Sequence, residues 1–170
     1  MLALVLILAS GVVTSSMTPS PTGEITVQGD FHSVTVRPPF RWSPQWKATA
    51  LAHRLVGFIL TSGKAPSTLH VRIDPARPED RSGQAAIHRR ILARYAETFV
   101  SPHARTVGKV RVAGQQIWIR YYTGVDNNSL IAVIPLERET VTFDISDEQG
   151  EDVRPLEPDF TKTVETAVVR

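Results

Sequence analysis

Histidine, serine and aspartate, the side chains that metal binding and hydrolysis most often use, occur in this chain without the spacing that either chemistry needs. The five histidines never stand two or four residues apart: they are His32, His53, His70, His88 and His103. No cysteine is present, which excludes disulfides, thiolate metal sites and cysteine nucleophiles. No Gly-x-Ser-x-Gly turn selects a nucleophilic serine. The sequence therefore predicts no catalytic residue, no metal site and no cofactor, and we expect a protein that is not an enzyme.

Two places could still supply oxygen or nitrogen ligands to a cation. His70 and Asp74 share one face of a predicted strand, but they would lie about 13 Å apart and would need ligands from elsewhere. The segment Asp126-Asn127-Asn128-Ser129 lacks the several carboxylates and the following glutamate of a calcium loop. We interpret it as a turn.

Acidic and basic residues are balanced in the segment that follows His70. Residues 72–81 hold Asp74, Glu79 and Asp80 together with Arg72, Arg77 and Arg81. This balance predicts charge compensation within the loop rather than cation binding.

Aromatic and basic side chains offer a candidate surface for a protein partner. In an alternating strand, Trp118, Arg120 and Tyr122 share the face opposite Ile117 and Ile119. Exposed large rings beside a cation often anchor a partner, whereas core packing is the alternative for the same rings. The predicted partner-binding residues are Trp118, Arg120, Tyr122, Arg89, Arg90 and Arg94. The alternative for the arginines is an ordinary solvated face.

Composition is that of one globular domain. The chain has 170 residues, of which 42% are hydrophobic and 21% charged. Its net charge is +2, from 19 basic and 17 acidic residues, which is too small an excess to predict nucleic-acid binding.

The N-terminal residues 1–16 (MLALVLILASGVVTSS) resemble a secretory signal peptide, although no Lys or Arg precedes the apolar run. The apolar run is shorter than the roughly 20 residues that span a bilayer. A signal peptide is therefore favoured over a membrane anchor, which is the alternative. We expect an exported, periplasmic or extracellular protein, with residues 17–24 as a linker and 25–170 as a single domain. Association with a membrane surface, through residues 1–16, is a further expectation.

Apolar residues at every second position predict an antiparallel meander over residues 107–146, with turns at Ala113-Gly114 and at 126–129. Shorter strands are expected at 25–27, 33–37, 53–61 and 68–73, and a loop or single helical turn near 44–50. Pro135 predicts a bulge or an unpaired edge position.

Helical periodicity predicts two helices, at about 82–99 with Ser82 as its cap and at 156–169. We expect both to pack side by side on the aliphatic face of the meander, which would leave Trp118, Arg120 and Tyr122 partly exposed.

The order of these segments resembles the PsbP-like superfamily, which includes extrinsic photosystem II proteins and Ran-binding Mog proteins. The similar segments are PPFRWSPQW at 38–46, LVGFILTSGKAPSTLHVRIDP at 55–75, GQAAIHRRILARY at 83–95, VRVAGQQIWIRYYT at 110–123, LIAVIPLERETVTFDIS at 130–146 and PDFTKTVETAVV at 158–169. The resemblance implies an α+β fold, in which an antiparallel sheet of about six to seven strands is flanked by two main helices. It also favours a strand at 53–61, where local propensity favours a helix.

Family members usually bind other proteins, so the resemblance implies a non-catalytic accessory domain that binds a protein partner, in a membrane-associated complex. A carrier of a small ligand or lipid, with a pocket between sheet and helices, is the alternative. A hydrolase is a third and more remote one.

Overall fold

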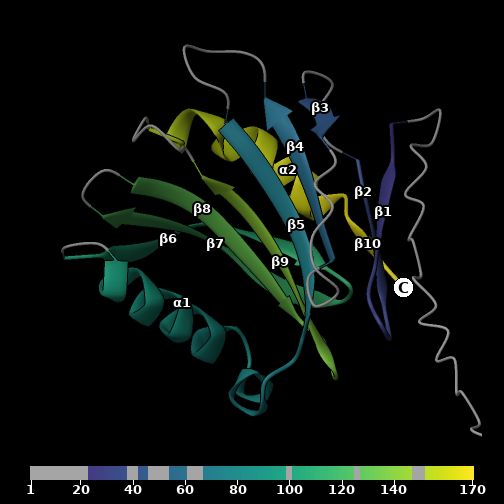
Figure 1. The fold of residues 1–170 in the computed structure, drawn as a ribbon, viewed down its shortest axis with the longest axis horizontal. Coiled ribbons are helices and arrows are strands. Elements are labelled where there is room, and N and C mark those ends of the chain that lie inside the picture. Colours follow the sequence, from purple (N-terminus) through teal and green to yellow (C-terminus); the bar gives the residue numbers. More distant parts are fainter. Residues whose placement is uncertain are drawn as a thin grey trace, which may run out of the picture.

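The computed structural model describes residues 23–37, 42–45, 54–60, 67–98, 101–124, 127–146 and 152–170. Two antiparallel sheets and two α-helices form this part of the chain, so the predicted α+β class is confirmed (Figure 1). The strands are β1 (Ile25–Gln28), β2 (Ser33–Val36), β3 (Trp42–Gln45), β4 (Arg54–Leu60), β5 (Ser67–Pro75), β6 (His103–Val112), β7 (Gln115–Gly124), β8 (Asn127–Pro135), β9 (Glu139–Ser146) and β10 (Val168–Val169). The helical elements are the 3-10 turns η1 (Pro78–Ser82) and η2 (Arg154–Leu156) and the helices α1 (Gln84–Thr98) and α2 (Glu157–Glu165).

The main sheet has seven strands in the order β3-β4-β5-β9-β8-β7-β6. The predicted meander forms four neighbouring strands of this sheet, β9, β8, β7 and the edge strand β6. Between β6 and β7, Ala113 and Gly114 turn with positive φ angles of 48° and 76°, as a two-residue hairpin requires. The prediction of a strand at 53–61 is confirmed, because β4 pairs with β5 from Arg54 opposite Ile73 to Leu60 opposite Ser67.

The second sheet has three strands in the order β1-β2-β10, and the sequence predicted only the first two. The predicted final helix to Val169 is too long: α2 ends at Glu165, and Val168 and Val169 pair with Thr35 and Val34 of β2. This short strand is the third strand of the small sheet and connects the end of α2 to β2.

Each face of the main sheet is covered by a different helix, so the expected side-by-side packing of the helices is wrong (Figure 1). The larger core lies on one face, where Phe160 and Val164 of α2 and the small sheet pack against the aliphatic side chains of β5 to β9. On the other face, Ile87 of α1 packs with Tyr122, Ile131 and Val133. Strand β8 explains the arrangement, since its continuous apolar run offers a surface to both sides.

Glu139 joins the two sheets. It is 3% exposed, and its carboxylate accepts hydrogen bonds from the backbone N–H groups of Asp30 (2.5 Å), Phe31 (3.3 Å) and His32 (2.9 Å) in the turn between β1 and β2. The His32 Nδ1 atom lies 2.9 Å from the same carboxylate. Gly29 is needed for this approach, because a Cβ at that position would collide with the Glu139 carboxylate.

Several predicted boundaries shift. Ser82 belongs to η1 rather than capping α1, and Gln45, expected in a loop, lies in β3. Asn127 to Ser129 begin β8, so the turn after β7 is shorter than predicted. Pro135 ends β8 opposite Thr140, beyond the last residue that pairs with β7.

The predicted signal peptide at 1–16 and most of the predicted linker at 17–24 lie outside the described residues. Within the described residues, no helix is both long and apolar enough to cross a membrane.

Candidate functional site

Helix α1 lies on the face of the sheet that was predicted to be open to a partner. Tyr122 is fully buried there, so the expectation that it is exposed is wrong. Trp118 and Arg120, on the same face of β7, are half-buried. The Trp118 ring stacks on the imidazole of His88, with 6.3 Å between ring centroids and 15° between their planes.

A buried polar network explains how a tyrosine can lie under this helix. The His88 Nδ1 atom and the Tyr122 hydroxyl are hydrogen-bonded at 2.6 Å, and the hydroxyls of Tyr95 and Ser129 at 2.6 Å. Burial, with a smaller contribution from the Arg120 charge, lowers the pKa of His88 to about 3. His88 is therefore a neutral, structural histidine at physiological pH.

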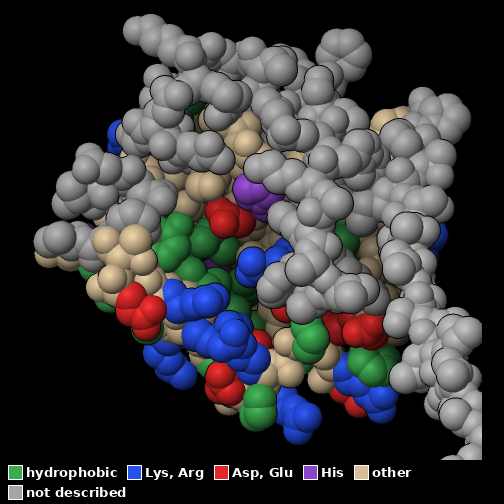
Figure 2. All heavy atoms as spheres, in the orientation of Figure 1, with side chains coloured by type: hydrophobic (Ala, Val, Ile, Leu, Met, Phe, Trp, Pro, Cys, Tyr) green, Lys and Arg blue, Asp and Glu red, His purple; other side chains and the backbone are tan. Residues whose placement is uncertain are grey.

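Beside α1, the same face of the sheet is hollowed into a cleft of about 550 Å³. Arg72 and Asp74 of β5 and Thr140 and Thr142 of β9 lie along its floor, because residues at alternate positions of a strand point to one face. The wall is the side of α1, and η1 and the β1–β2 turn lie at its ends. Figure 2 shows Lys and Arg side chains gathered on this face between α1 and the sheet, with some acidic side chains among them. The residues that line the cleft are Asp30, Arg72, Ile73, Asp74, Pro75, Ala76, Arg77, Pro78, Asp80, Ile87, Arg90, Ile91, Arg94, Glu139, Thr140 and Thr142.

Two arginines of the cleft are neutralised by aspartates. The Arg90 Nη2 atom donates to both carboxylate oxygens of Asp80, at 2.8 and 2.9 Å, and Asp80 is 2% exposed. Arg72 Nε lies 2.6 Å from Asp74 Oδ2. The predicted charge compensation within residues 72–81 thus occurs for Arg72 and Asp74, while the partner of Asp80 comes from α1.

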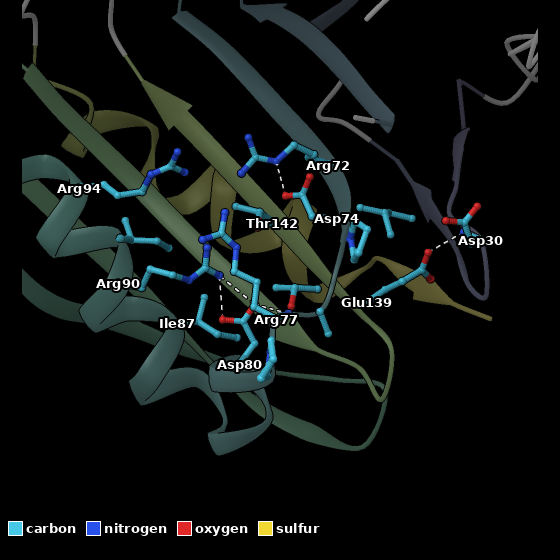
Figure 3. Close-up of a pocket in the computed structure, with 16 residues that line it drawn as sticks. Asp30, Arg72, Asp74, Arg77, Asp80, Ile87, Arg90, Arg94, Glu139 and Thr142 are labelled. Carbon is cyan, nitrogen blue, oxygen red and sulfur yellow. Dashed lines mark hydrogen bonds and ion pairs between the residues drawn. The ribbon is translucent and has the colours of Figure 1, made fainter. Parts of the chain in front are cut away.

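The two remaining arginines leave the cleft with an excess of positive charge. Within the described part of the chain, no carboxylate pairs with the guanidinium of Arg77 or Arg94, and both residues are exposed. The Glu139 carboxylate is already occupied by the β1–β2 turn. Figure 3 shows the four arginines gathered at one side of the cleft, with Glu139 and Asp30 at the other. Guanidinium groups in a partly enclosed site favour a phosphate or carboxylate.

The three arginines predicted on α1 are separated by the helix. Arg90 and Arg94 line the cleft, whereas Arg89 is exposed and is not among the lining residues. Sequence reasoning missed Arg72, Thr140 and Thr142, although the alternation of polar and apolar residues in β5 and β9 carried a signal. A polar residue at every second position of two central strands indicates that one face of the sheet is in contact with solvent there.

Two places were considered from the sequence as sources of cation ligands. His70 and Asp74 lie four residues apart on β5, where Asp74 is paired with Arg72 and His70 stands opposite Asp144. In the described segments, no three His, Asp or Glu residues cluster as metal ligands would. In the segment 126–129, which was interpreted as a turn, Asp126 lies outside the described residues and Asn128 accepts a hydrogen bond from the Tyr121 hydroxyl at 2.9 Å.

No protein-family model matches the chain, and no curated protein matches it. Among solved structures, the chain is similar to LpqN of Mycobacterium tuberculosis, whose crystal structure is described as that of a protein involved in cell envelope biogenesis. The TM-score is 0.52 at 12% identity, over 86% of this chain and 90% of LpqN. The two proteins share a fold. The resemblance to the PsbP-like superfamily remains a prediction.

Proposed function

We propose that this protein is an exported, non-catalytic binding protein that takes an anionic ligand into the cleft beside α1. The observation that carries the proposal is the presence of two guanidinium groups, on Arg77 and Arg94, that face the cleft without a carboxylate partner among the described residues. The other charged groups of the floor and wall are paired, so a bound anion would meet these two arginines first.

Two observations support export. Residues 1–16 have the apolar run and small residues of a signal peptide. The fold is shared with LpqN, a protein involved in cell envelope biogenesis. An accessory role in an envelope is consistent with both.

Titration of the full chain with inorganic phosphate, at constant ionic strength, tests the cleft. We expect saturable amide shifts in the NMR spectrum at η1, α1 and β9, with a dissociation constant roughly in the millimolar range expected of so small a ligand. Arg94→Ala and Arg77→Ala should each weaken binding about tenfold, because each removes a charge-assisted hydrogen bond.

Arg89→Ala is the matched control, since it removes the same charge from the same helix outside the cleft. Its phosphate affinity should stay within about twofold of the wild type, as expected for a screened exposed charge. Equal losses in the Arg89 and Arg94 variants would mean that phosphate senses only net charge, and the proposal would fail.

A second candidate function, docking of a protein partner, is favoured by the ring of Trp118. It remains half-buried on β7 with Arg120 on the same face, and the exposed Lys109 of β6 stands opposite it. A large ring beside two cations suits an acidic protein surface. Affinity capture from an envelope extract should then lose the same partner with Trp118→Ala and with Arg120→Ala. Recovery unchanged in both variants would exclude this face.

A further inference from the structure

The floor of the cleft holds a hydroxyl group that nothing in the described part of the chain satisfies. Thr140 is 3% exposed, it lines the cleft, and its Oγ1 atom has no hydrogen-bond partner there. It stands opposite Asp74 of β5, whose carboxylate pairs with Arg72. A buried hydroxyl without a partner is unfavourable, so a ligand oxygen that accepts its proton recovers that free energy.

The wall of the cleft holds a second such donor. Arg90 of α1 directs its Nη2 atom to both carboxylate oxygens of the buried Asp80, at 2.8 and 2.9 Å, and this pairing fixes its guanidinium (Figure 3). The Arg90 Nε atom is also buried, and none of the described residues accepts a hydrogen bond from it. An Nε–H group can only donate, so whatever satisfies it must be an acceptor.

The two unpaired arginines of the cleft can adapt to a ligand, whereas the two buried donors are fixed. Arg77 and Arg94 are exposed, and exposed side chains change rotamer within picoseconds to nanoseconds. Because the Thr140 and Arg90 donors are shielded from solvent, a ligand reaches them only when lining side chains turn aside. The exposed arginines are the lining side chains best able to do so, and each brings a guanidinium to the ligand as it moves.

The number of donors distinguishes between the two kinds of anion that guanidinium groups favour. A carboxylate has two oxygens with about four lone pairs, and two bidentate guanidinium groups use all of them. A carboxylate bound in this way leaves the Thr140 hydroxyl and the Arg90 Nε–H group unsatisfied. A phosphate monoester has three terminal oxygens in a tetrahedral arrangement, so it can meet both arginines and still direct an oxygen toward the floor.

We infer that the ligand of the cleft carries a phosphoryl group, which is held by Thr140 and Arg90 in addition to the two unpaired arginines. This inference rests on the proposed function, and it names the class of the anion and two further binding residues. The cleft of about 550 Å³ has room for the organic part of a phosphate monoester beside the apolar side chains of Ile87 and Ile91.

The test compares the affinities of the full chain for glycerol 3-phosphate and malonate, measured by titration at about pH 7.5 and constant ionic strength. Both anions are close to doubly charged there, but malonate carries its charge on carboxylates. Glycerol 3-phosphate should bind at least about tenfold more tightly. If malonate binds as tightly, the inference fails while the proposed anion site stands. If neither of these anions nor inorganic phosphate gives saturable binding, both fail.

Thr140→Val removes the floor hydroxyl at nearly constant volume. It should weaken glycerol 3-phosphate binding about tenfold and change malonate affinity by less than about twofold. Its unfolding free energy should not fall, because the hydroxyl has no partner in the described chain to lose. Thr140→Ser keeps the hydroxyl and should retain the preference for the phosphate monoester. Wild-type affinity for glycerol 3-phosphate in Thr140→Val would overturn the assignment of this hydroxyl.

Arg90→Lys tests the second donor, because it keeps a cation beside Asp80 but lacks the Nε–H group. Affinity for glycerol 3-phosphate should fall by about fivefold or more. Arg89→Lys makes the same replacement on the same helix outside the cleft, and it should leave this affinity unchanged. Equal effects of the two lysine variants would remove Arg90 from the site.

Vesicles distinguish a soluble phosphate monoester from the same group on a lipid. The full chain is sedimented with phosphatidylcholine vesicles that either contain or lack phosphatidic acid, whose headgroup is a phosphate monoester. Sedimentation that requires phosphatidic acid and is displaced by glycerol 3-phosphate supports the inference with a lipid ligand. Binding of glycerol 3-phosphate without sedimentation supports it with a soluble ligand.

Discussion

Replacement of Glu139 by alanine is expected to destabilise the domain by about 2–4 kcal/mol. The carboxylate is the common acceptor for three successive backbone N–H groups of the β1–β2 turn, and hydrogen bonds to a charged acceptor are stronger than neutral ones. Its removal leaves those donors without their acceptor and detaches the turn from β9. Denaturant unfolding of the full chain gives the free energy, and amide exchange at Asp30 to His32 shows whether the loss begins in the turn.

Glu137→Ala is the matched control, because this glutamate is exposed and precedes Glu139 by two residues. It should change the unfolding free energy by less than about 0.5 kcal/mol. Glu139→Gln should fall between the two, since an amide keeps one acceptor oxygen but directs an NH₂ group toward donors. Equal stability of the two alanine variants would show that the carboxylate does not hold the turn.

The strands were predictable from the sequence because they follow a short-range rule. Side chains alternate between the two faces of a strand, so an alternation of apolar and polar residues predicts β5, β7 and β9. The β4 segment needed more than local propensity, since its apolar residues also fit a helix. The two-residue strand β10 was missed because Val168 and Val169 continue the helical spacing of α2, and only pairing with β2 distinguishes them.

The placement of the helices could not be predicted in the same way. Trp118, Arg120 and Tyr122 look like an exposed face because each carries a polar atom, yet His88 and α1 satisfy the Tyr122 hydroxyl and bury it. A polar atom is expensive to bury only when it lacks a partner, and the partner here is 34 residues away in sequence. The continuous apolar run of β8 is the better guide, because such a run indicates a strand that is covered on both faces.

Some of the residues that line the cleft could be predicted from the sequence, but not that they come together. Arg90 and Arg94 were recognised on the helix and a strand was recognised at 68–73, but nothing local shows that α1 lies beside β5 and β9. The excess charge at Arg77 and Arg94 depends on which carboxylates find other partners. Asp80 pairs with Arg90, and Glu139 is occupied by a turn more than 100 residues away. Such pairings are a property of the folded chain alone.

Replacement of Asp144 by asparagine is expected to stabilise the domain at pH 7. Burial, partly opposed by the Arg72 charge, raises the pKa of this carboxyl to about 6 from its ordinary value near 3.8. The folded state therefore binds more protons than the unfolded state between about pH 4 and pH 6, and stability falls as the pH rises through that range. The ionised carboxylate costs about 1–3 kcal/mol above pH 6, and a neutral amide avoids that cost. At pH 4 the two proteins should be nearly equal in stability.

Unfolding free energies of both proteins, measured from pH 4 to pH 7, test this expectation. His88 acts in the opposite sense, because its pKa is lowered to about 3 and its stability contribution is lost as the pH falls below about 6.5. In the wild type, the opposite effects of Asp144 and His88 on the unfolding free energy partly cancel as the pH falls. In Asp144→Asn only the His88 effect remains, so the unfolding free energy should decrease measurably below pH 6.5. Asp152→Asn is the control, because hydrogen bonding to Arg154 lowers the pKa of the exposed Asp152 carboxyl and its replacement should not stabilise the domain. An Asp144→Asn protein that is less stable than wild type at pH 7 would mean that the ionised carboxylate has a stabilising partner in the folded state, and the expectation would be wrong.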